Sequence, residues 1–241
     1  MRLAVCHPGA DTSTSDVYDG LVAALVRAGH EVVEYLLNLR IGRAKSWYEF
    51  NYRRAKKIDP TIVRPTFADW LYLAGERFLP ICLREHVDWA IVVTGQYFHS
   101  DWLWMLQRAN VPTALLCTET PYDQEKEANA LRYVTCGWTN ERSSVEYLRQ
   151  YNPHVWYLPH AYDPEKHHPG QEDDEDVPAH DVVFVGTGFS ERIELLMGVD
   201  WTGIDLGLYG NWELPRSHPL RRFVRGGVVP NKYAAALYRR A

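Results

Sequence analysis

The chain has 241 residues, enough for one large domain or two modest ones. Hydrophobic residues make up 46% of it and charged residues 24%, which is the balance of an ordinary globular protein. The formal net charge of −5 at pH 7 argues against a nucleic acid or a membrane surface as the main partner. No apolar run is as long as a membrane span and no signal peptide precedes the first apolar run, so we expect a cytoplasmic protein with no membrane span.

The sequence contains none of the familiar motifs of hydrolases, kinases or metalloenzymes. It has no GxSxG, no Walker loop, no HExxH and no CxxC. Because the adjacent His167 and His168 lack the spacing of metal ligands, we expect no metal site. The four cysteines are scattered, and Cys6 and Cys117 lie in apolar runs, which indicates buried thiols in a reducing compartment.

The opening of the chain predicts a strand, a helix and a second strand. Residues 2–6 and 31–37 are short apolar runs typical of buried strands. Between them, Ser13 begins a capping box, apolar residues then recur every three or four positions, and Gly29 supplies a helix stop. Units of this kind build parallel sheets.

The same rhythm continues to about residue 160. Further strands are expected at residues 89–93, 113–117, 133–135 and 155–158, which gives about six strands in all. Helices are expected at residues 43–58, from Thr66 through Phe78 with Pro80 bending or ending it, from Ser100, and from Asn140. The sequence therefore predicts an α/β fold, with a doubly wound Rossmann-like parallel sheet over residues 1–163.

A boundary and a second domain follow. Residues 164–180 include the acidic run 172–176 and almost no apolar residue, so they read as an exposed linker. The α/β pattern then restarts, with strands expected at residues 181–185 and 204–209 and helices at 191–197 and 232–240. We expect an incomplete second Rossmann-like domain over residues 181–241, because about 60 residues are too few to close a sheet with helices on both faces.

Three polar loops of the first domain follow the carboxyl ends of expected strands, where open α/β sheets bind ligands. Carboxylates and histidines there are candidates for orienting a hydroxyl group or acting as a base, although loop polarity and helix capping are the commoner reason for any single one of them. These candidates are Gly9, Asp11, Thr12, Ser13, His99, Glu119 and Asp123.

The second domain begins with a glycine turn at residues 186–188, between an apolar strand and a helix. Backbone N–H groups and a helix N-terminus at such a turn favour a phosphate, and Arg192 follows one turn later. Gly210, Asn211 and Trp212 end the next expected strand. Glycine is also common in ordinary β-to-α turns, and residues 186–188 do not complete a GxGxxG motif.

Several strings of this sequence resemble GT-B glycosyltransferases of group 1, in the branch typified by spore-maturation proteins. The match extends along the whole chain, and the string at residues 181–196 is its most specific part. The matching strings are 25–32, at the end of the first βαβ unit; 157–169, before the linker; 181–196, at the start of the donor domain; and 208–212, 226–229 and 236–238.

The resemblance implies two facing Rossmann domains of GT-B type and metal-independent sugar transfer in the cleft. A nucleotide-diphosphate sugar would be the co-substrate, with no other cofactor and an acceptor that the sequence does not identify. For the donor, the resemblance implies that Gly186, Thr187, Gly188 and Arg192 face the diphosphate and that Gly210, Asn211 and Trp212 lie under the nucleotide. On the first-domain side it implies that Glu119 and His160 line the cleft and handle the acceptor. From the position of their loops we expect Asp123 to share the catalytic role. For the same reason we expect acceptor binding by Gly9, Asp11, Thr12, Ser13 and His99.

The family's donor domain continues beyond the helix at residues 236–238. We therefore expect the remainder to come from a longer or split gene product, or from a second chain or a homo-oligomer, and we expect these 241 residues alone to transfer sugar poorly. A non-catalytic relative that binds a nucleotide sugar or a protein stays open. An unrelated dinucleotide-binding Rossmann enzyme is disfavoured, because the first βαβ unit has no GxGxxG followed by an acidic residue.

Overall fold

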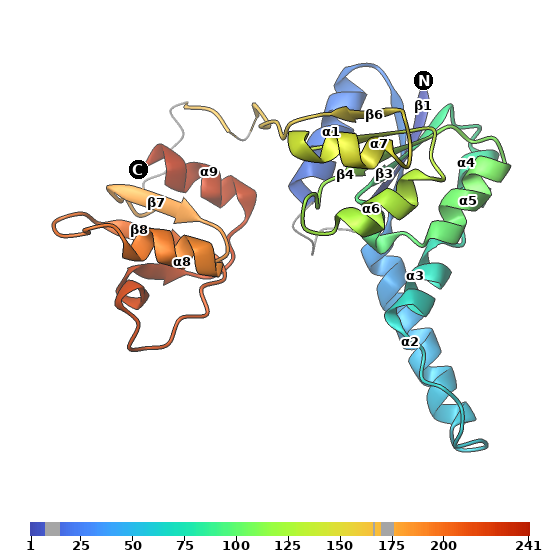
Figure 1. Ribbon diagram of the computed structural model, residues 1–241, viewed down its shortest axis with the longest axis horizontal. Coiled ribbons are helices and arrows are strands. Elements are labelled where there is room, and N and C mark those ends of the chain that lie inside the picture. The colour runs from blue at the N-terminus through green and yellow to red at the C-terminus, as the bar shows by residue number, and fades with distance from the viewer. Residues whose placement is uncertain (8–14, 166, 170–175) are drawn as a thin grey trace. The chain divides into compact units, whose positions relative to one another are not determined.

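The computed structural model describes residues 1–7, 15–165, 167–169 and 176–241. The chain divides into two compact units, Met1–His160 and Ala161–Ala241 (Figure 1). Each unit has its own sheet, and every pair of neighbouring strands in both sheets is parallel. The prediction of an α/β protein built on parallel sheets is confirmed.

The first unit is built on six strands, as the sequence predicted. They are β1 (Arg2–His7), β2 (Glu31–Leu36), β3 (Trp89–Val93), β4 (Thr113–Cys117), β5 (Cys136–Thr139) and β6 (Val155–Tyr157). Their order across the sheet is β2-β1-β3-β4-β5-β6. The chain reverses direction across the sheet after β2, and at such a reversal the carboxyl ends of strands open a crevice for ligands.

Helices cover both faces of this sheet. Val5 of β1 packs with α1 (Ser15–Arg27) on one face, while its neighbours Ala4 and Cys6 pack with the other helices on the opposite face. Those helices are α2 (Leu37–Ala55), α3 (Phe67–Gly75), α4 (Phe78–Arg84), α5 (Ser100–Arg108), α6 (Gln124–Leu131) and α7 (Val145–Arg149), with short 3-10 turns η1 (Gly95–Tyr97) and η2 (Arg142–Ser144). All four cysteines are buried and free, in agreement with the sequence.

One expected strand was misplaced. Residues 133–135 form the turn after α6, and the strand is instead β5, which begins at Cys136. Gly137 lies inside β5 because a Cβ there would overlap the Leu131 side chain of α6. This glycine is therefore the residue that lets α6 pack against the sheet.

Several helix boundaries also differ from the expected ones. Leu37, predicted as the end of a strand, is the first residue of α2. The single helix expected from Thr66 is two helices, because α3 ends at Gly75 and α4 begins at Phe78. Pro80 then lies in the first turn of α4, where its missing N–H costs no hydrogen bond. Thr66 does cap α3, and it forms a capping box with Asp69.

The second unit contains three parallel strands, β7 (Val182–Val185), β8 (Leu206–Tyr209) and β9 (Val224–Gly226), in that order. Its helices are α8 (Ser190–Met197), α9 (Asn231–Arg239) and the 3-10 turn η3 (Pro219–Phe223). Leu206 and Leu208 of β8 pack with α8, whereas Tyr209 packs with α9 on the opposite face. Helices thus lie on both faces of this three-stranded sheet, so the second unit is α/β like the first.

The last residues of the expected linker pack within the second unit. Val177 is buried with Ala236 and Leu237 of α9. The His180 side chain is buried against β8, over Gly207. The second unit therefore uses residues that precede its first strand to complete its core.

Candidate functional site

Polar side chains gather at the carboxyl ends of β3, β4 and β5 in the first unit. Gln96 Nε2 donates to Asp123 Oδ2 at 2.7 Å, and this contact joins the loop after β3 to the loop after β4. The peptide N–H of Glu119 donates to Glu127 Oε1 at 3.0 Å and ties the end of β4 to α6. We define the strand-end cluster as residues 94–96, 118–120, 123, 127, 139, 140 and 160.

Glu127 is the most unusual titratable group of this cluster. Its side chain is fully buried in α6, and this burial raises the pKa of the carboxyl group to about 7, although the N–H of Glu119 acts against the shift. Its Oε2 has no hydrogen-bond partner among the described residues. A carboxyl group that titrates near neutral pH can both give and take a proton, a property shared by catalytic acids and bases.

Thr94 is strained and buried beside Glu127's helix. It has φ +49° at the end of β3, a conformation that β-branched residues rarely adopt, and its side chain is fully buried. The hydroxyl oxygens of Thr94 and of Thr118 both lack a partner among the described residues. With Glu127 Oε2 they make three buried polar atoms that a bound ligand or water would satisfy.

A chain of hydrogen bonds connects β5 to His160. The Thr120 hydroxyl donates to Asn140 Oδ1 at 2.9 Å, so the Thr139 hydroxyl, 2.6 Å from it, must donate to Thr120. Asn140 Nδ2 donates in turn to His160 Nε2 at 2.9 Å. The neutral His160 ring then carries its proton on Nδ1, and because His160 is exposed this N–H can donate to a ligand.

The other first-unit candidates take different places. Asp123 is also engaged by Lys126 Nζ at 2.9 Å, which compensates its charge. His99 caps α5, where its Nδ1 accepts from the N–H of Asp101, and no contact among the described residues ties it to the strand-end cluster. Gly9, Asp11, Thr12 and Ser13 lie outside the described residues.

Sequence reasoning did not select Glu127 or Asn140 as site residues. Asn140 was expected to cap a helix, but Glu141 caps η2 instead, through the N–H of Ser143, and Asn140 faces His160. Glu127 lies in a charged segment without apolar periodicity, where the helix α6 itself was missed. A lone sequence offers no signal that separates a buried carboxylate in such a segment from an exposed one.

The glycines of the second unit allow two strand ends to touch. We define the glycine turn as residues 186–188 together with 210–212. Gly210 has φ +116°, and a Cβ there would overlap the carbonyl group of Gly186. A Cβ on Gly188 would overlap the ring of Trp212. The residues predicted to bind a donor are therefore neighbours in space.

Arg192 lies beside this turn, in the first turn of α8. Its Nη1 donates to the carbonyl oxygen of Thr187 at 2.8 Å, and the guanidinium lies over the rings of Phe184 and Phe189 at 5.4 and 5.0 Å. The side chain is half-buried, and no carboxylate among the described residues lies within ion-pair distance of it. Most of its N–H groups are thus left for another acceptor.

Other donor candidates are occupied within the protein. The N–H of Gly186 donates to Tyr209 and the N–H of Gly188 to Asn211, at 2.8 and 2.9 Å, so these two amides are not free for a phosphate. Trp212 is only 4% exposed and packs in the core, where it supports the turn without offering a face for stacking.

Within the described parts of the chain, no three His, Cys, Asp or Glu side chains are grouped as metal ligands. Nor does any described helix combine the length and the apolar character needed to cross a bilayer. Comparisons with protein-family models and with curated proteins gave no significant match to this sequence.

Proposed function

We propose that this chain transfers a sugar from a nucleotide-diphosphate donor to a hydroxyl group of an acceptor. The observation that carries the proposal is the Arg192 guanidinium, half-buried beside the glycine turn and without a carboxylate partner among the described residues. A diphosphate offers paired oxygens and negative charge, which a guanidinium binds as a fork.

The start of α8 supports the same assignment. Its N-cap residue, Phe189, has no side-chain oxygen with which to cap the first N–H groups of the helix. These N–H groups and the helix dipole favour an anion at this end. Because the amides of Gly186 and Gly188 are occupied, the diphosphate would bind to the start of α8 and to Arg192. The glycines would serve only to let the ends of β7 and β8 approach each other.

The strand-end cluster of the first unit would handle the acceptor. In the proposed reaction the acceptor oxygen bonds to the anomeric carbon of the sugar, and the bond from that carbon to the diphosphate breaks with its electron pair going to the diphosphate. The hydroxyl proton passes to the Glu119 carboxylate, and His160 Nδ1–H donates a hydrogen bond that orients the acceptor. Arg192 stabilises the charge that develops on the leaving diphosphate.

Calorimetric titration with UDP, GDP and NAD tests the donor site. We expect UDP or GDP to bind more tightly than NAD, and we expect Arg192→Ala to weaken that binding at least about tenfold by removing the charged hydrogen bonds. Arg221→Ala removes an exposed arginine of the same unit and should leave the affinity unchanged. If neither diphosphate bound, or if both arginine variants lost affinity equally, the assigned donor site would be wrong.

A transfer assay with radiolabelled nucleotide sugars tests the chemistry. Glu119→Gln should lower the transfer rate by about 10² or more while the affinity for the diphosphate stays the same, because the substitution removes the base. Glu125→Gln, on the exposed side of α6, is the matched control. Full activity of the Glu119→Gln variant would rule out the role given to Glu119.

One observation favours a second candidate, a protein that binds the nucleotide sugar without transferring it. Asp123 is compensated by Lys126 and Gln96, and both glycine amides are used internally, so fewer groups are free for catalysis than the sequence suggested. Such a protein would bind the diphosphate through Arg192 and show no transfer with any donor sugar.

A further inference from the structure

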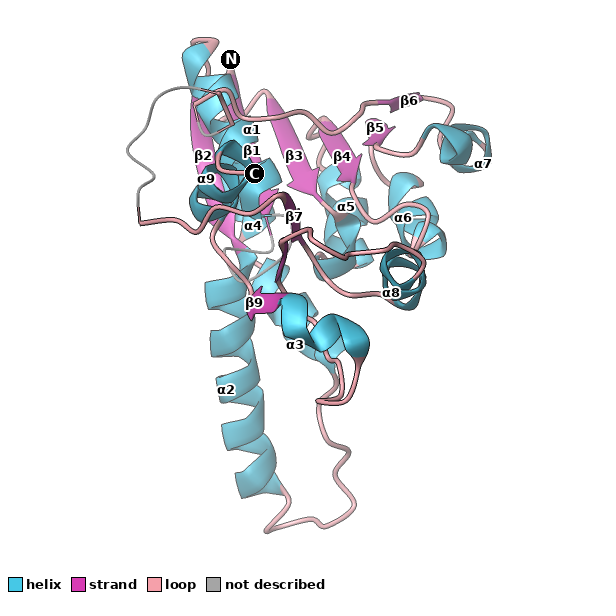
Figure 2. Ribbon diagram, turned by 90° about the vertical axis from the view of Figure 1, so that its left-hand side faces the viewer, coloured by secondary structure: helices cyan, strands magenta, loops and turns pink. Residues whose placement is uncertain are grey.

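The segment from Leu37 to Thr66 carries a charge opposite to that of the whole chain. It holds eight basic residues and two acidic ones, so its formal charge is +6 while the chain carries −5. Figure 2 shows that α2, which makes up most of this segment, extends well beyond the sheet of the first unit, with the loop to α3 at its far end. We call residues 37–66 the basic hairpin.

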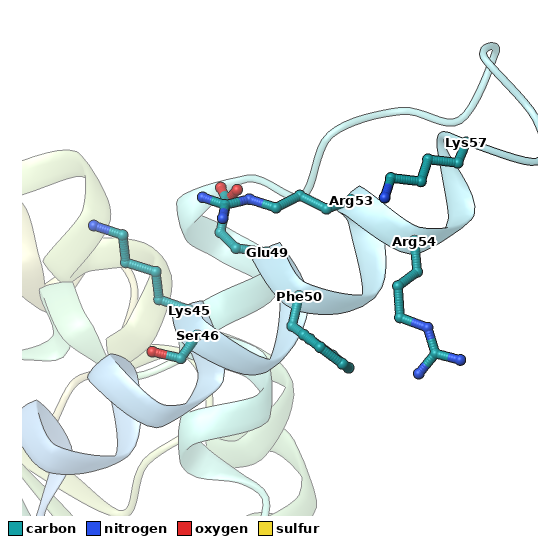
Figure 3. Close-up of a pocket in the computed structure, with 7 residues that line it drawn as sticks. All are labelled: Lys45, Ser46, Glu49, Phe50, Arg53, Arg54 and Lys57. Carbon is teal, nitrogen blue, oxygen red and sulfur yellow. The ribbon is translucent and has the colours of Figure 1, made fainter.

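Charge and apolar side chains lie together on the outer face of α2. Leu37, Ala44 and Tyr48 follow a helical period on the side that packs against α3. The opposite side carries residues spaced by three, four or seven positions, and all of them are exposed: Leu39, Arg43, Phe50, Arg54 and Lys57. Figure 3 shows Phe50 beside Arg54 along a shallow pocket that Lys45, Ser46, Glu49, Arg53 and Lys57 also line.

The two carboxylates of the basic hairpin do not neutralise this outer face. Glu49 is held by Arg64, which donates to its Oε1 from Nη2 at 2.8 Å and from Nε at 3.1 Å. Asp59 accepts from the N–H and hydroxyl of Thr61, and these bonds hold its pKa below the usual value. Among the described residues no carboxylate lies within ion-pair distance of Arg43, Arg54 or Lys57.

The far end of the hairpin exposes aliphatic side chains between cations. Ile58 is 87% exposed and Val63 is 83% exposed, and Lys56, Lys57 and Arg64 flank them. Trp47 and Phe50 add exposed aromatic area along α2. Large aliphatic groups gain nothing from a phosphate backbone, but they gain free energy when they leave water for the acyl-chain boundary of a membrane.

We propose that the basic hairpin docks this protein on the surface of an anionic lipid bilayer. The arginines and lysines contact lipid phosphates, while Phe50, Ile58 and Val63 enter the interface. This inference goes beyond the proposed function and does not depend on it. The net negative charge of the whole chain argued against a membrane-surface partner, but that sum includes a local segment with a positive charge.

Vesicle flotation tests the proposal. Wild-type protein should float with vesicles of phosphatidylcholine containing about one-third phosphatidylglycerol, should not float with phosphatidylcholine alone, and should be released by salt. Replacing Arg53, Arg54 and Lys57 with glutamine should lower the partition coefficient at least about tenfold. The matched control replaces Arg216, Arg221 and Lys232, which changes the net charge equally and should leave binding intact.

A second pair of variants separates a membrane from another polyanion. Ile58→Ser with Val63→Ser keeps every charge, and it should lower vesicle binding several-fold with no change in circular dichroism, because both side chains are exposed. The native cysteines are buried, so a thiol-reactive fluorophore should label the Val63→Cys variant selectively. The emission maximum of this fluorophore should shift to the blue when anionic vesicles are added. The proposal is overturned if vesicle binding does not depend on lipid charge, or if the control triple variant loses as much vesicle binding as the triple variant of the hairpin. It is also overturned if the serine double variant binds vesicles normally while an oligonucleotide displaces the vesicles from the protein.

Discussion

At the scale of single residues, the strand-end cluster concentrates features that proteins seldom tolerate without a use. Thr94 holds a left-handed backbone conformation, and Glu127 is a fully buried carboxyl group, one oxygen of which has no hydrogen-bond partner in the described part of the chain. Both lie at the carboxyl-end edge of the parallel sheet, the edge at which open α/β sheets bind ligands. The strained backbone of Thr94 and the buried carboxyl group of Glu127 both cost folding free energy, and both lie at the candidate site.

Glu127→Gln should change how stability depends on pH. Burial raises the folded pKa of Glu127 from the ordinary 4.5 to about 7, so the folded protein holds this proton more tightly than the unfolded chain does. Its contribution is thus most favourable below pH 4.5 and is lost as the pH rises through 7. Glutamine stays neutral, so the variant should gain up to about 3 kcal/mol relative to wild type between pH 4.5 and pH 8.

Urea unfolding at several pH values measures this difference, with Glu125→Gln as the exposed control on the same helix. If the stabilities of wild type and Glu127→Gln stayed parallel over this range, Glu127 would not be a neutral carboxyl group in the folded protein.

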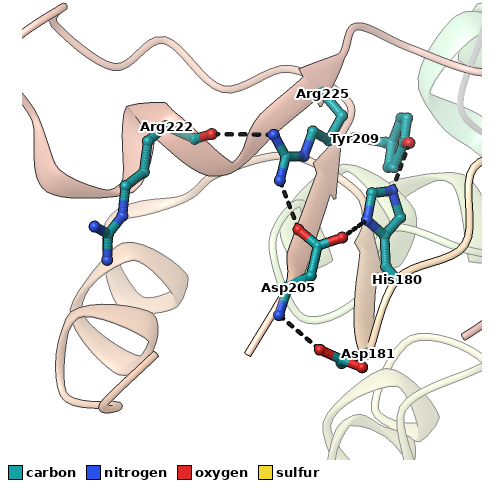
Figure 4. A network of polar contacts seen from close by, with 6 residues as sticks. All are labelled: His180, Asp181, Asp205, Tyr209, Arg222 and Arg225. Atoms are coloured by element: carbon teal, nitrogen blue, oxygen red, sulfur yellow. Dashed lines mark hydrogen bonds and ion pairs between the residues drawn. The ribbon is translucent and has the colours of Figure 1, made fainter. Parts of the chain in front are cut away.

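At the scale of elements, a polar network braces the sheet of the second unit. Asp205, just before β8, accepts from His180 at 2.7 Å and from Arg225 of β9 at 2.6 Å, and His180 Nε2 also meets the Tyr209 hydroxyl at 2.9 Å (Figure 4). These bonds join the segment before β7 to β8 and β9. The hydrogen bond from His180 and then the one from Arg225 hold the pKa of Asp205 below its usual 3.8.

Asp205→Asn should destabilise the second unit at pH 7 by roughly 1 kcal/mol or less, because Asp205 is half exposed and solvent weakens its ion pairs. A lowered pKa gives stability that is present above pH 3.8 and is lost as the pH falls through the folded value. The stabilities of wild type and variant should therefore converge in acid. Thermal unfolding across pH 2–7 measures both stabilities, with Glu194→Gln as an exposed control. A stability difference between wild type and Asp205→Asn that persisted in acid would contradict this account.

At the scale of the whole molecule, the chain contains separate hydrophobic cores. The clusters around β1–β6 use residues of the first unit alone, and those around β7–β9 use residues from Val177 onward. Since each core is closed within its own unit, neither needs the other to remove its apolar surface from water.

Residues 1–160, expressed alone, should therefore fold and unfold cooperatively. The full chain should show two transitions in urea, and the fragment should retain one of them at nearly the same midpoint. Circular dichroism and near-ultraviolet spectra at increasing urea concentrations would measure this. A fragment without a cooperative transition, or a midpoint far below that of the full chain, would show that the first core depends on the second unit.

The sequence by itself determined the elements whose signal is local. Apolar runs located β3 and β4, and Thr66 located the start of α3, because burial and capping depend on neighbours along the chain. The strand ends that hold Glu119 and the glycine turn followed from the same pattern.

Only the tertiary structure decided the features that depend on distant contacts. β5 begins only at Cys136, where Gly137 receives Leu131 of α6, and Glu127 is buried because α6 packs over the end of β4. The exposure of the basic hairpin likewise depends on where α3 begins beside α2. Periodicity predicts which side of a helix or strand faces the core. The residues that pack against that side come from distant segments of the chain, and they set the pKa and the accessibility of each side chain.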